Sequence, residues 1–253
     1  MVYGIYSSAA GMLANQYRQD VLANNLANVA TAAFKQDLAV MRERPQAIRE
    51  RGLDPDAGDR RLAGLTGGTL VAPTYTSWEP GTIETTGGAL DAAIVGEGFF
   101  RVRADGAERF TRDGRFSLNE RGELVTAAGQ AQVLDETGRT IVVPGDLAAR
   151  VRINANGEVT AGEEVFGRVA VVRFDDKTLL RKTGGNLFQA LGAAPARLET
   201  TLQTGAYEGS NVDATRAMVS MIEVNRAYQM NATMVTLADQ TLGRAVNDLA
   251  RVK

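Results

Sequence analysis

The residues that most often carry out catalysis are missing from this sequence. It contains no cysteine and no histidine, which removes thiolate chemistry, the commonest general base and the commonest metal ligand. The remaining candidates are two pairs of adjacent acids, Glu163-Glu164 and Asp175-Asp176. Paired carboxylates can hydrolyse a glycoside, but adjacent residues on a strand point to opposite faces. We therefore expect solvated turns at both pairs, no catalytic residue, no metal site, no cofactor and no enzyme.

No binding motif accompanies these acids. Gly96-Glu97-Gly98 lacks the third glycine of a dinucleotide-binding loop and precedes a strand-like run, so it predicts a turn. Residues 42–68 hold six arginines, but five acids lie among them. This near-balance favours a solvated or interface-forming loop over a nucleic-acid site, and the net charge of -2 gives no attractive field for nucleic acid. The arginines are Arg42, Arg44, Arg49, Arg51, Arg60 and Arg61.

Composition is that of an ordinary soluble protein, with 44% hydrophobic and 23% charged residues. No apolar run approaches the ~20 residues that a membrane span needs, so we expect no membrane insertion. The first residues lack the basic and apolar regions of a secretory signal. By this criterion the chain stays in the cytoplasm or leaves it by a route that needs no cleaved signal.

The clearest element is a C-terminal helix from about residue 213 to residue 250. The segment has no proline, and Met221, Tyr228, Val235, Leu242 and Leu249 recur every seven residues. Such a repeat is typical of a helix that lies along another helix. A second row, in the adjacent register, consists of Met218, Asn225, Ala232, Asp239 and Val246. This row either contributes polar residues that fix the register of the seam or faces solvent, and the sequence leaves both alternatives open.

Residues 4 to about 29 predict the partner helix. Its apolar stripe is weaker, because Gln16 and Gln19 interrupt it. Asn24, Asn25 and Asn28 crowd its last turn, where side-chain amides can bond to the backbone. The stripe comprises Ile5, Ala9, Met12, Leu22, Leu26 and Val29, with Phe34 and Lys35 following.

Between the helices, short apolar runs alternate with turn formers such as Asp105-Gly106 and Asn156-Gly157. We expect an antiparallel meander in a sandwich or irregular barrel. The predicted fold class is α+β, with terminal helices forming a coiled-coil-like stalk and a central all-β domain inserted between them. The expected segments are 1–41 (helical), 42–68 (arginine-rich loop), 69–207 (β domain) and 208–253 (long helix packing on the first).

Three separated groups of motifs share one family pattern. They are Ala23-Asn24-Asn25-Leu26-Ala27-Asn28-Val29 with Thr31 and Phe34-Lys35; Trp78-Glu79-Pro80-Gly81, Leu90-Asp91, Gly96-Glu97-Gly98-Phe99-Phe100 and Phe110-Thr111-Arg112-Asp113-Gly114; and Glu208-Gly209-Ser210-Asn211-Val212 with Met221-Ile222-Glu223-Val224-Asn225-Arg226-Ala227-Tyr228. Together they resemble the bacterial flagellar rod and hook proteins over nearly the whole chain. The length and the last motif look most like proximal rod members, and distal rod members come next.

This resemblance implies a structural subunit of the flagellar basal-body rod in the periplasm. Such a subunit is exported unfolded through the type III apparatus, assembles helically with copies of itself and neighbouring rod proteins, and transmits torque. Both helices would be disordered in dilute monomer and would order on assembly. We expect the assembly interface to comprise Ile5, Met12, Leu22, Leu26, Val29, Phe34, Met218, Met221, Tyr228, Val235, Leu242, Val246 and Leu249.

One departure and one alternative accompany the resemblance. The family commonly has asparagine and glycine where this chain has Ala30 and Ala33. Because glycine readily adopts positive φ, we expect Ala33 to form a different turn. The alternative function is a glycan-binding β domain on a dimerising helical stalk, with Tyr75 and Trp78 stacking on a sugar. A lone tryptophan beside a Pro-Gly turn is nevertheless more typical of a packing residue.

Overall fold

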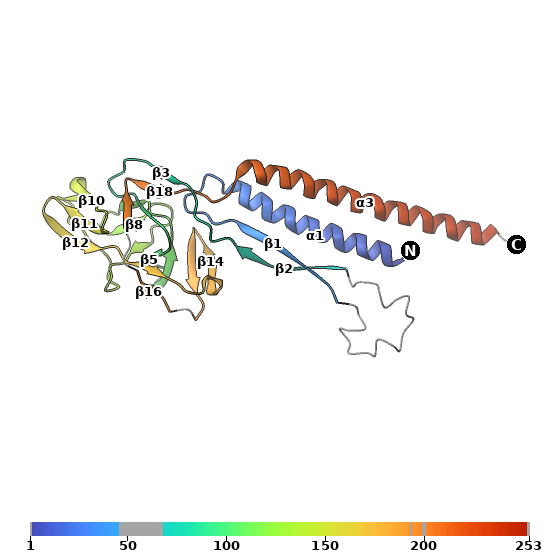
Figure 1. Cartoon of the computed structure of the whole chain (residues 1–253), viewed down its shortest axis with the longest axis horizontal. Coiled ribbons are helices and arrows are strands. Elements are labelled where there is room, and N and C mark those ends of the chain that lie inside the picture. The colour runs from blue at the N-terminus through green and yellow to red at the C-terminus, as the bar shows by residue number, and fades with distance from the viewer. Residues whose placement is uncertain (1, 46–67, 193, 199–200, 252–253) are drawn as a thin grey trace. The chain divides into compact units, whose positions relative to one another are not determined.

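The structure is a computed structural model that describes residues 2–45, 68–192, 194–198 and 201–251. Contacts divide the chain into two compact units (Figure 1). The helical unit comprises Met1–Ala27, Gln36–Ser77 and Asp213–Lys253, and the β unit comprises Asn28–Lys35 and Trp78–Val212. A helix at each end and strands between them confirm the α+β class.

The helical unit contains two long helices. α1 (Val2–Ala27) and α3 (Ala214–Arg251) lie side by side and run antiparallel (Figure 1). Asp213 caps α3, because its carboxylate accepts a hydrogen bond from the Arg216 N–H at 3.0 Å. Both helices begin and end within two residues of the predicted limits. Neither helix in the described ranges combines the length and hydrophobicity that a membrane crossing requires.

One set of buried or half-buried side chains on α3 follows a regular alternation of four and three residues. They are Ala217, Met221, Val224, Tyr228, Asn231, Val235, Ala238, Leu242 and Ala245. The predicted row from Met221 to Leu242 belongs to this set, but its companion row starts at Ala217 and not at Met218. A shift of one residue rotates a side chain by about 100° around the helix. Met218, Asn225, Asp239 and Val246 are accordingly exposed, as the solvent-facing alternative requires, while Ala232 is half-buried.

A hairpin accompanies α1. β1 (Asp37–Glu43) pairs antiparallel with β2 (Thr69–Thr76), and the register shifts between Leu38 and Val40. The boundary expected at residue 41 therefore falls inside a strand, and residues 69–76 group with the helices. Arg42 and Arg44 are exposed near the end of β1. Arg49, Arg51, Arg60 and Arg61 of the arginine-rich segment lie outside the described residues.

Antiparallel pairs make up the described sheets of the β unit, but they do not form a simple meander. The largest sheet has the strand order β14-β15-β6-β5-β9-β8-β7, with β13 and β16 attached through β5. These strands are β5 (Phe99–Ala104), β6 (Ala107–Thr111), β7 (Phe116–Leu118), β8 (Leu124–Thr126), β9 (Gln132–Val133), β13 (Val171–Arg173), β14 (Leu180–Gly184), β15 (Leu187–Ala190) and β16 (Ala196–Arg197).

Smaller sheets complete the unit. β10 (Val151–Ile153), β11 (Glu158–Ala161) and β12 (Glu164–Arg168) form one of them. β3 (Ile83–Thr85) pairs with β18 (Ala206–Glu208), and β4 (Ala92–Ile94) pairs with β17 (Leu202–Thr204). The expected Asp105-Gly106 turn joins β5 to β6, and both residues have positive φ, at 52° and 73°.

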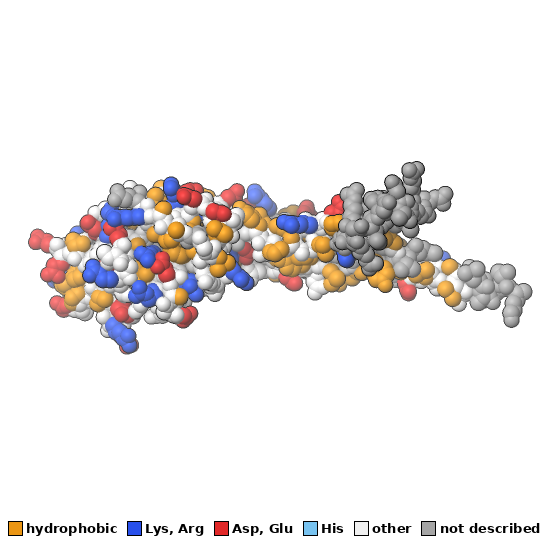
Figure 2. Space-filling model, turned by 90° about the horizontal axis from the view of Figure 1, so that it is seen from below, with side chains coloured by type: hydrophobic (Ala, Val, Ile, Leu, Met, Phe, Trp, Pro, Cys, Tyr) orange, Lys and Arg blue, Asp and Glu red, His pale blue; other side chains and the backbone are white. Residues whose placement is uncertain are grey.

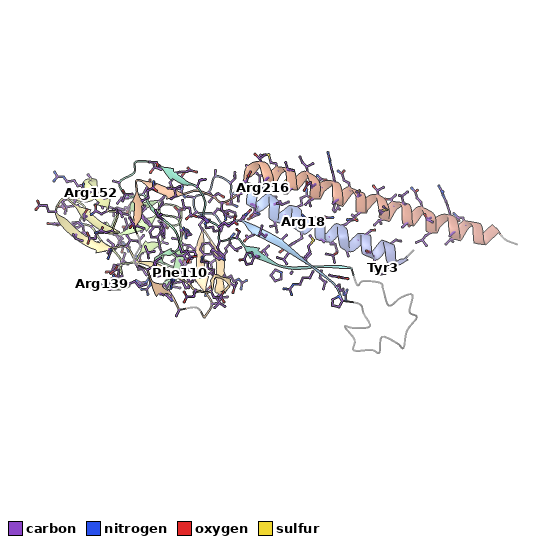
Figure 3. The ribbon with its side chains drawn as sticks, in the orientation of Figure 1. Tyr3, Arg18, Phe110, Arg139, Arg152 and Arg216 are labelled. Carbon is purple, nitrogen blue, oxygen red and sulfur yellow. The ribbon has the colours of Figure 1, made fainter. Side chains whose placement is uncertain are left out.

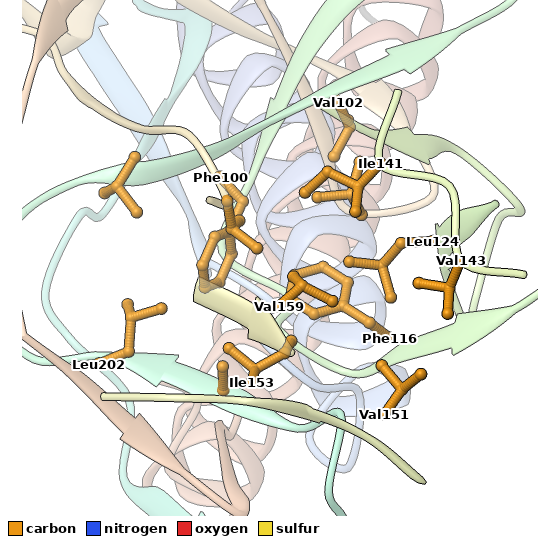
Figure 4. Close-up of a cluster of buried hydrophobic side chains, with 14 of the residues drawn as sticks. Phe100, Val102, Phe116, Leu124, Ile141, Val143, Val151, Ile153, Val159 and Leu202 are labelled. Atoms are coloured by element: carbon orange, nitrogen blue, oxygen red, sulfur yellow. The ribbon is translucent and has the colours of Figure 1, made fainter. Parts of the chain in front are cut away.

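Two apolar clusters form the core of the β unit. The larger one gathers side chains from several sheets, such as Phe100 of β5, Val159 of β11 and Leu202 of β17 (Figure 4). The smaller one is aromatic and joins Phe99 and Phe188 to neighbouring side chains. Burial of each large side chain contributes about 1.5–3 kcal/mol, so these clusters are the main source of the unit's stability.

Candidate functional site

The three motif groups meet at one carboxylate inside the β unit. Oε1 of Glu208 accepts hydrogen bonds from Lys35 Nζ at 2.5 Å and from the Gly81 N–H at 2.8 Å. Oε2 accepts one from Arg112 Nε at 2.6 Å. We call Lys35, Arg112 and Glu208 the signature cluster, because each comes from a different motif group. Lys35 and Glu208 are 173 residues apart in the sequence.

Backbone carbonyls accept further hydrogen bonds from these cations. Arg112 donates from Nη1 to the Gly98 carbonyl at 2.9 Å and from Nη2 to the Gly96 carbonyl at 2.7 Å. Lys35 also donates to the Glu79 carbonyl at 2.8 Å. The segment 96–98, which follows and includes bends, therefore presents the carbonyls of Gly96 and Gly98 to Arg112, which gives the predicted turn a specific role.

Burial and charge act on this cluster in opposite directions. The side chains of Lys35 and Glu208 are 0% and 2% exposed. Burial lowers the pKa of Lys35, against the opposing effect of Glu208. Burial by itself would raise the pKa of Glu208, but Arg112 and then Lys35 outweigh it and hold that pKa below its ordinary value of 4.5. Glu208 is thus ionised at neutral pH, and the buried position of the cluster fits a structural role.

Backbone bonds reinforce the cluster. The Ala33 N–H donates to the Glu208 carbonyl at 2.7 Å, and the Asn211 N–H donates to the Phe34 carbonyl at 3.1 Å. Lys182 Nζ lies 4.5 Å from the centroid of the Phe34 ring, within the range of a cation–π interaction. These contacts bury Phe34 in the β unit and join residues 33–34 to residues 208–211.

Ala33 keeps the conformation that glycine would favour. Its φ is +55°, so the prediction of a different turn is wrong. Left-handed backbone costs about 1–2 kcal/mol for a residue with a Cβ atom. The surrounding bonds hold it in place, because Ala33 donates to Glu208 and the Ala32 carbonyl accepts from Asn186 Nδ2 at 2.7 Å. Tertiary contacts therefore override the local preference.

Asn25 performs a related task in the helical unit. Its Nδ2 donates to the Asp37 carbonyl at 2.7 Å, and its Oδ1 accepts from the Asp37 N–H at 2.9 Å. The buried amide thus pairs with the first residue of β1 as a neighbouring strand would. This agrees with the expectation that asparagines at the end of the first helix bond to backbone.

The structure places the expected assembly residues in different environments. Met218 and Val246 are exposed, Phe34 is buried, and the side chain of Leu249 lies outside the described residues. The remaining residues are half-buried, with Val29 in the β unit and the others in the helical unit: Ile5, Met12, Leu22, Leu26, Val29, Met221, Tyr228, Val235 and Leu242.

Sequence reasoning missed a second apolar row on α3. We call Val219, Ile222, Met230, Met234 and Leu237 the outer stripe. At about 100° per residue, Met234 lies on the flank of the seam and the other four lie on the side turned away from it. All five are at least half exposed, and Met230 reaches 64%. A helical-wheel plot of the C-terminal segment would have revealed them.

Apolar exposure in the helical unit extends beyond α3. Hydrophobic side chains also gather on the face of the unit shown in Figure 2. Tyr6 and Leu13 of α1 are exposed, as are Leu70 and Tyr75 of the hairpin.

Trp78 is a packing residue. Its ring lies 5.6 Å from the Phe99 ring and 5.0 Å from the Phe188 ring, measured between centroids. Tyr75, the other candidate for sugar stacking, belongs to β2 in the helical unit. The pair expected in a glycan-binding domain therefore has no support in the structure.

The adjacent acids behave as turn and surface residues. Glu163 and Glu164 are exposed. Asp175 pairs with Arg173 at 3.3 Å, and Asp176 caps a short 3-10 helix, Lys177–Leu179, by accepting from the Thr178 N–H. Arg139 and Arg152 extend from the β unit into solvent (Figure 3). On the face visible in Figure 2, acidic and basic side chains of this unit intermingle.

Comparisons with known proteins agree with the convergence of motifs. Three family models match in succession: "Flagella basal body rod protein" at residues 5–35, "Flagellar hook protein FlgE/F/G D1 domain" at 93–161, and "Flagellar basal body rod FlgEFG protein C-terminal" at 203–249. They cover the segments that carry Lys35, Arg112 and Glu208.

Relatives match over nearly their whole length. The flagellar basal-body rod protein FlgF of Caulobacter vibrioides is 37% identical over 92% of both chains. FlgG of Buchnera aphidicola subsp. Acyrthosiphon pisum is 32% identical over 96% of this chain and 98% of its own. FlgG of Bacillus subtilis is also 32% identical, over 98% and 99%. The chain therefore belongs to the flagellar basal-body rod protein family, and it is a structural protein of the flagellar basal body and not an enzyme.

Proposed function

We propose that this chain is a rod subunit of the proximal, FlgF-like type that polymerises helically through its terminal helices and transmits torque. The observation that carries this proposal is the outer stripe on α3. One side of the helix already packs on α1, yet its flank and opposite side expose five large apolar side chains. Large apolar side chains that gather on an exposed helix face typically mark a contact with another protein or a membrane.

The unequal lengths of the two helices add support. α3 has 38 residues and α1 has 26, and Gly11 of α1 lies against Asn231 of α3. In an antiparallel pair this register sets Val2 beside about residue 240, so roughly 15 Å of α3 continues past α1. Leu242 stands at the start of this extension, and Val246 within it is 65% exposed. A helix from another copy can continue the coiled-coil-like seam there.

Identical contacts between copies produce a filament when the rotation between them does not close. Other rod proteins of the family would contact the first and the last copies of this chain in the filament. The chain would travel unfolded through the type III export apparatus, and its terminal helices would order when neighbours cover their apolar rows. The free energy of contact between subunits would then also stabilise the folded state of the helices.

A substitution at the start of the extension tests the proposal. Leu242→Asp places a charge in the seam and should abolish swimming, while the thermal unfolding of the β unit, followed by Trp78 fluorescence, stays unchanged. Gln240→Asp is the matched control, because Gln240 is exposed and two residues away. Normal swimming of the Leu242→Asp strain contradicts the proposal.

Amide exchange tests the ordering of the helices on assembly. In dilute monomer, residues 218–245 should exchange rapidly, whereas in assembled rods they should be protected. Strong protection of this range in the monomer would show that the helical unit orders without neighbours.

A further inference from the structure

The β unit is discontinuous in sequence, and its last segment completes it. β17 pairs with β4, and β18 pairs with β3, so residues 202–208 supply one of the two strands in each of two small sheets. Leu202 and Ala206 of this segment are buried, and Leu202 belongs to the larger apolar cluster. The segment therefore contributes both backbone pairing and core packing.

Glu208 gives this segment a further importance. Without it, Lys35 and Arg112 would be two cations buried close together with no carboxylate between them. Removing one partner of a buried ion pair is strongly destabilising, because a charge is left in the interior without compensation. Lys35 and Arg112 should therefore not reach their native positions before Glu208 does.

We propose that Glu208 is a folding latch: the β unit folds only when residues 202–211 dock between the segments that carry Lys35 and Arg112. Folding is then conditional on a segment that lies 173 residues beyond Lys35 and 96 beyond Arg112. The biological use of the latch rests on the proposed function. A subunit that is exported unfolded gains from a β unit that cannot fold before its C-terminal segment is present.

The competing order of events is that residues 78–198 fold first and Glu208 closes onto them afterwards. Refolding kinetics of the full-length chain separate the two orders. The chain has one tryptophan, and Trp78 packs on Phe99 and Phe188, so its fluorescence reports on the β unit. The measurement is stopped-flow refolding from urea and unfolding into urea, in wild type and in Glu208→Gln.

If Glu208 docks in the rate-limiting step, Glu208→Gln should slow refolding about tenfold or more and change unfolding less than about twofold. If the latch closes later, refolding stays at the wild-type rate and unfolding accelerates, which overturns the proposal.

Asp113→Asn is the matched control, because Asp113 is also buried but pairs with Arg115 only two residues away. It should slow refolding less than about threefold. Equal slowing by both variants would show a general effect of a lost buried carboxylate and would overturn the proposal.

A double variant keeps the test decisive if Glu208→Gln does not fold. Lys35→Met combined with Glu208→Gln removes one of the two buried cations that Glu208→Gln leaves without a carboxylate. The double variant should refold about fivefold faster than Glu208→Gln alone, or should fold where the single variant does not. No gain in either rate or yield overturns the proposal. All these measurements use the monomer. If the latch proposal fails, the proposed rod function still stands, and if the rod function is wrong, the refolding results keep their meaning.

Discussion

The side-chain amide of Asn25 pairs with the backbone of Asp37 in both directions. Nδ2 donates to the Asp37 carbonyl and Oδ1 accepts from the Asp37 N–H, so the end of α1 is tied to the start of β1 within the helical unit. This single contact explains why an asparagine occupies a buried position in a helix, where its propensity is poor. It also fixes the point at which the chain enters the hairpin.

Asn25→Ala should remove both hydrogen bonds between the end of α1 and Asp37. The substitution leaves the N–H and the carbonyl of half-buried Asp37 without the Asn25 amide, at a cost of about 1–3 kcal/mol. Native-state hydrogen exchange at the Asp37 amide in assembled rods measures the effect directly, and its protection should fall by about tenfold or more. Gln16→Ala, at an exposed position of the same helix, is the control and should leave the Asp37 amide protected. Unchanged exchange at Asp37 in Asn25→Ala would refute the pairing.

Low pH should weaken the β unit through Glu208. Its pKa is held below 4.5 in the folded protein, so the folded state binds fewer protons than the unfolded state as the pH falls toward that value. The stabilisation is therefore present above the unfolded pKa and is lost as pH falls through the folded pKa. Urea midpoints read by Trp78 fluorescence should drop in wild type below about pH 4.5.

Two variants isolate the contribution of Glu208 to this acid sensitivity. Glu208→Gln should start from lower stability and show a flatter dependence over the same pH range, because the amide does not titrate. Glu163→Gln, at an exposed site, should retain the wild-type slope. Parallel curves for Glu208→Gln and wild type would assign the acid sensitivity to other carboxylates.

Periodic elements of this fold are predictable from sequence. Both helices and the row from Met221 to Leu242 follow from apolar spacing alone, because period reports which face of a helix is covered. The companion row is harder to predict. Asn231 and the small Ala217 and Ala238 carry little apolar signal, and the place of Asn231 against α1 depends on the glycine at position 11.

Contacts between distant residues account for most of what the sequence did not reveal. Lys35 and Glu208 are separated by 173 residues, and no local sequence pattern predicts a buried ion pair between residues so far apart. β1 falls across two expected segments, the helical segment 1–41 and the arginine-rich loop 42–68, because its partner β2 lies far along the chain and no local pattern indicates the pairing. The positive φ of Ala33 likewise depends on hydrogen bonds from remote residues, so local preference misleads there.

Ala33 should tolerate glycine but not valine. Glycine relieves about 1–2 kcal/mol of left-handed strain, while the lost methyl group and the gain in unfolded-state freedom offset about as much. Thermal unfolding of Ala33→Gly should therefore stay within a few degrees of wild type. A β-branched side chain is a genuine outlier at positive φ, and Ala33 is only 1% exposed. Ala33→Val should lower stability by about 3 kcal/mol or more through strain and overpacking. Similar melting temperatures for the two variants would contradict the left-handed turn.

α1 and α3 approach each other closely at Gly11. A Cβ atom added there would lie 2.9 Å from Asn231 Nδ2, whereas one added at Gly4 would meet nothing within 4 Å. Gly4→Ala should therefore stabilise α1 by about 0.5–1 kcal/mol through helix propensity. Gly11→Ala should lose that gain, because the Asn231 amide must move aside.

The double variant Gly11→Ala with Asn231→Ala should recover the lost stability, since the shortened side chain clears the space. Assembled rods are the appropriate sample, with helix content followed by circular dichroism during thermal unfolding. A positive coupling of about 0.5–1 kcal/mol between the two substitutions is expected for residues in contact. Additive effects would mean that Gly11 and Asn231 do not pack together, and the antiparallel register from which the free extension of α3 follows would then be wrong.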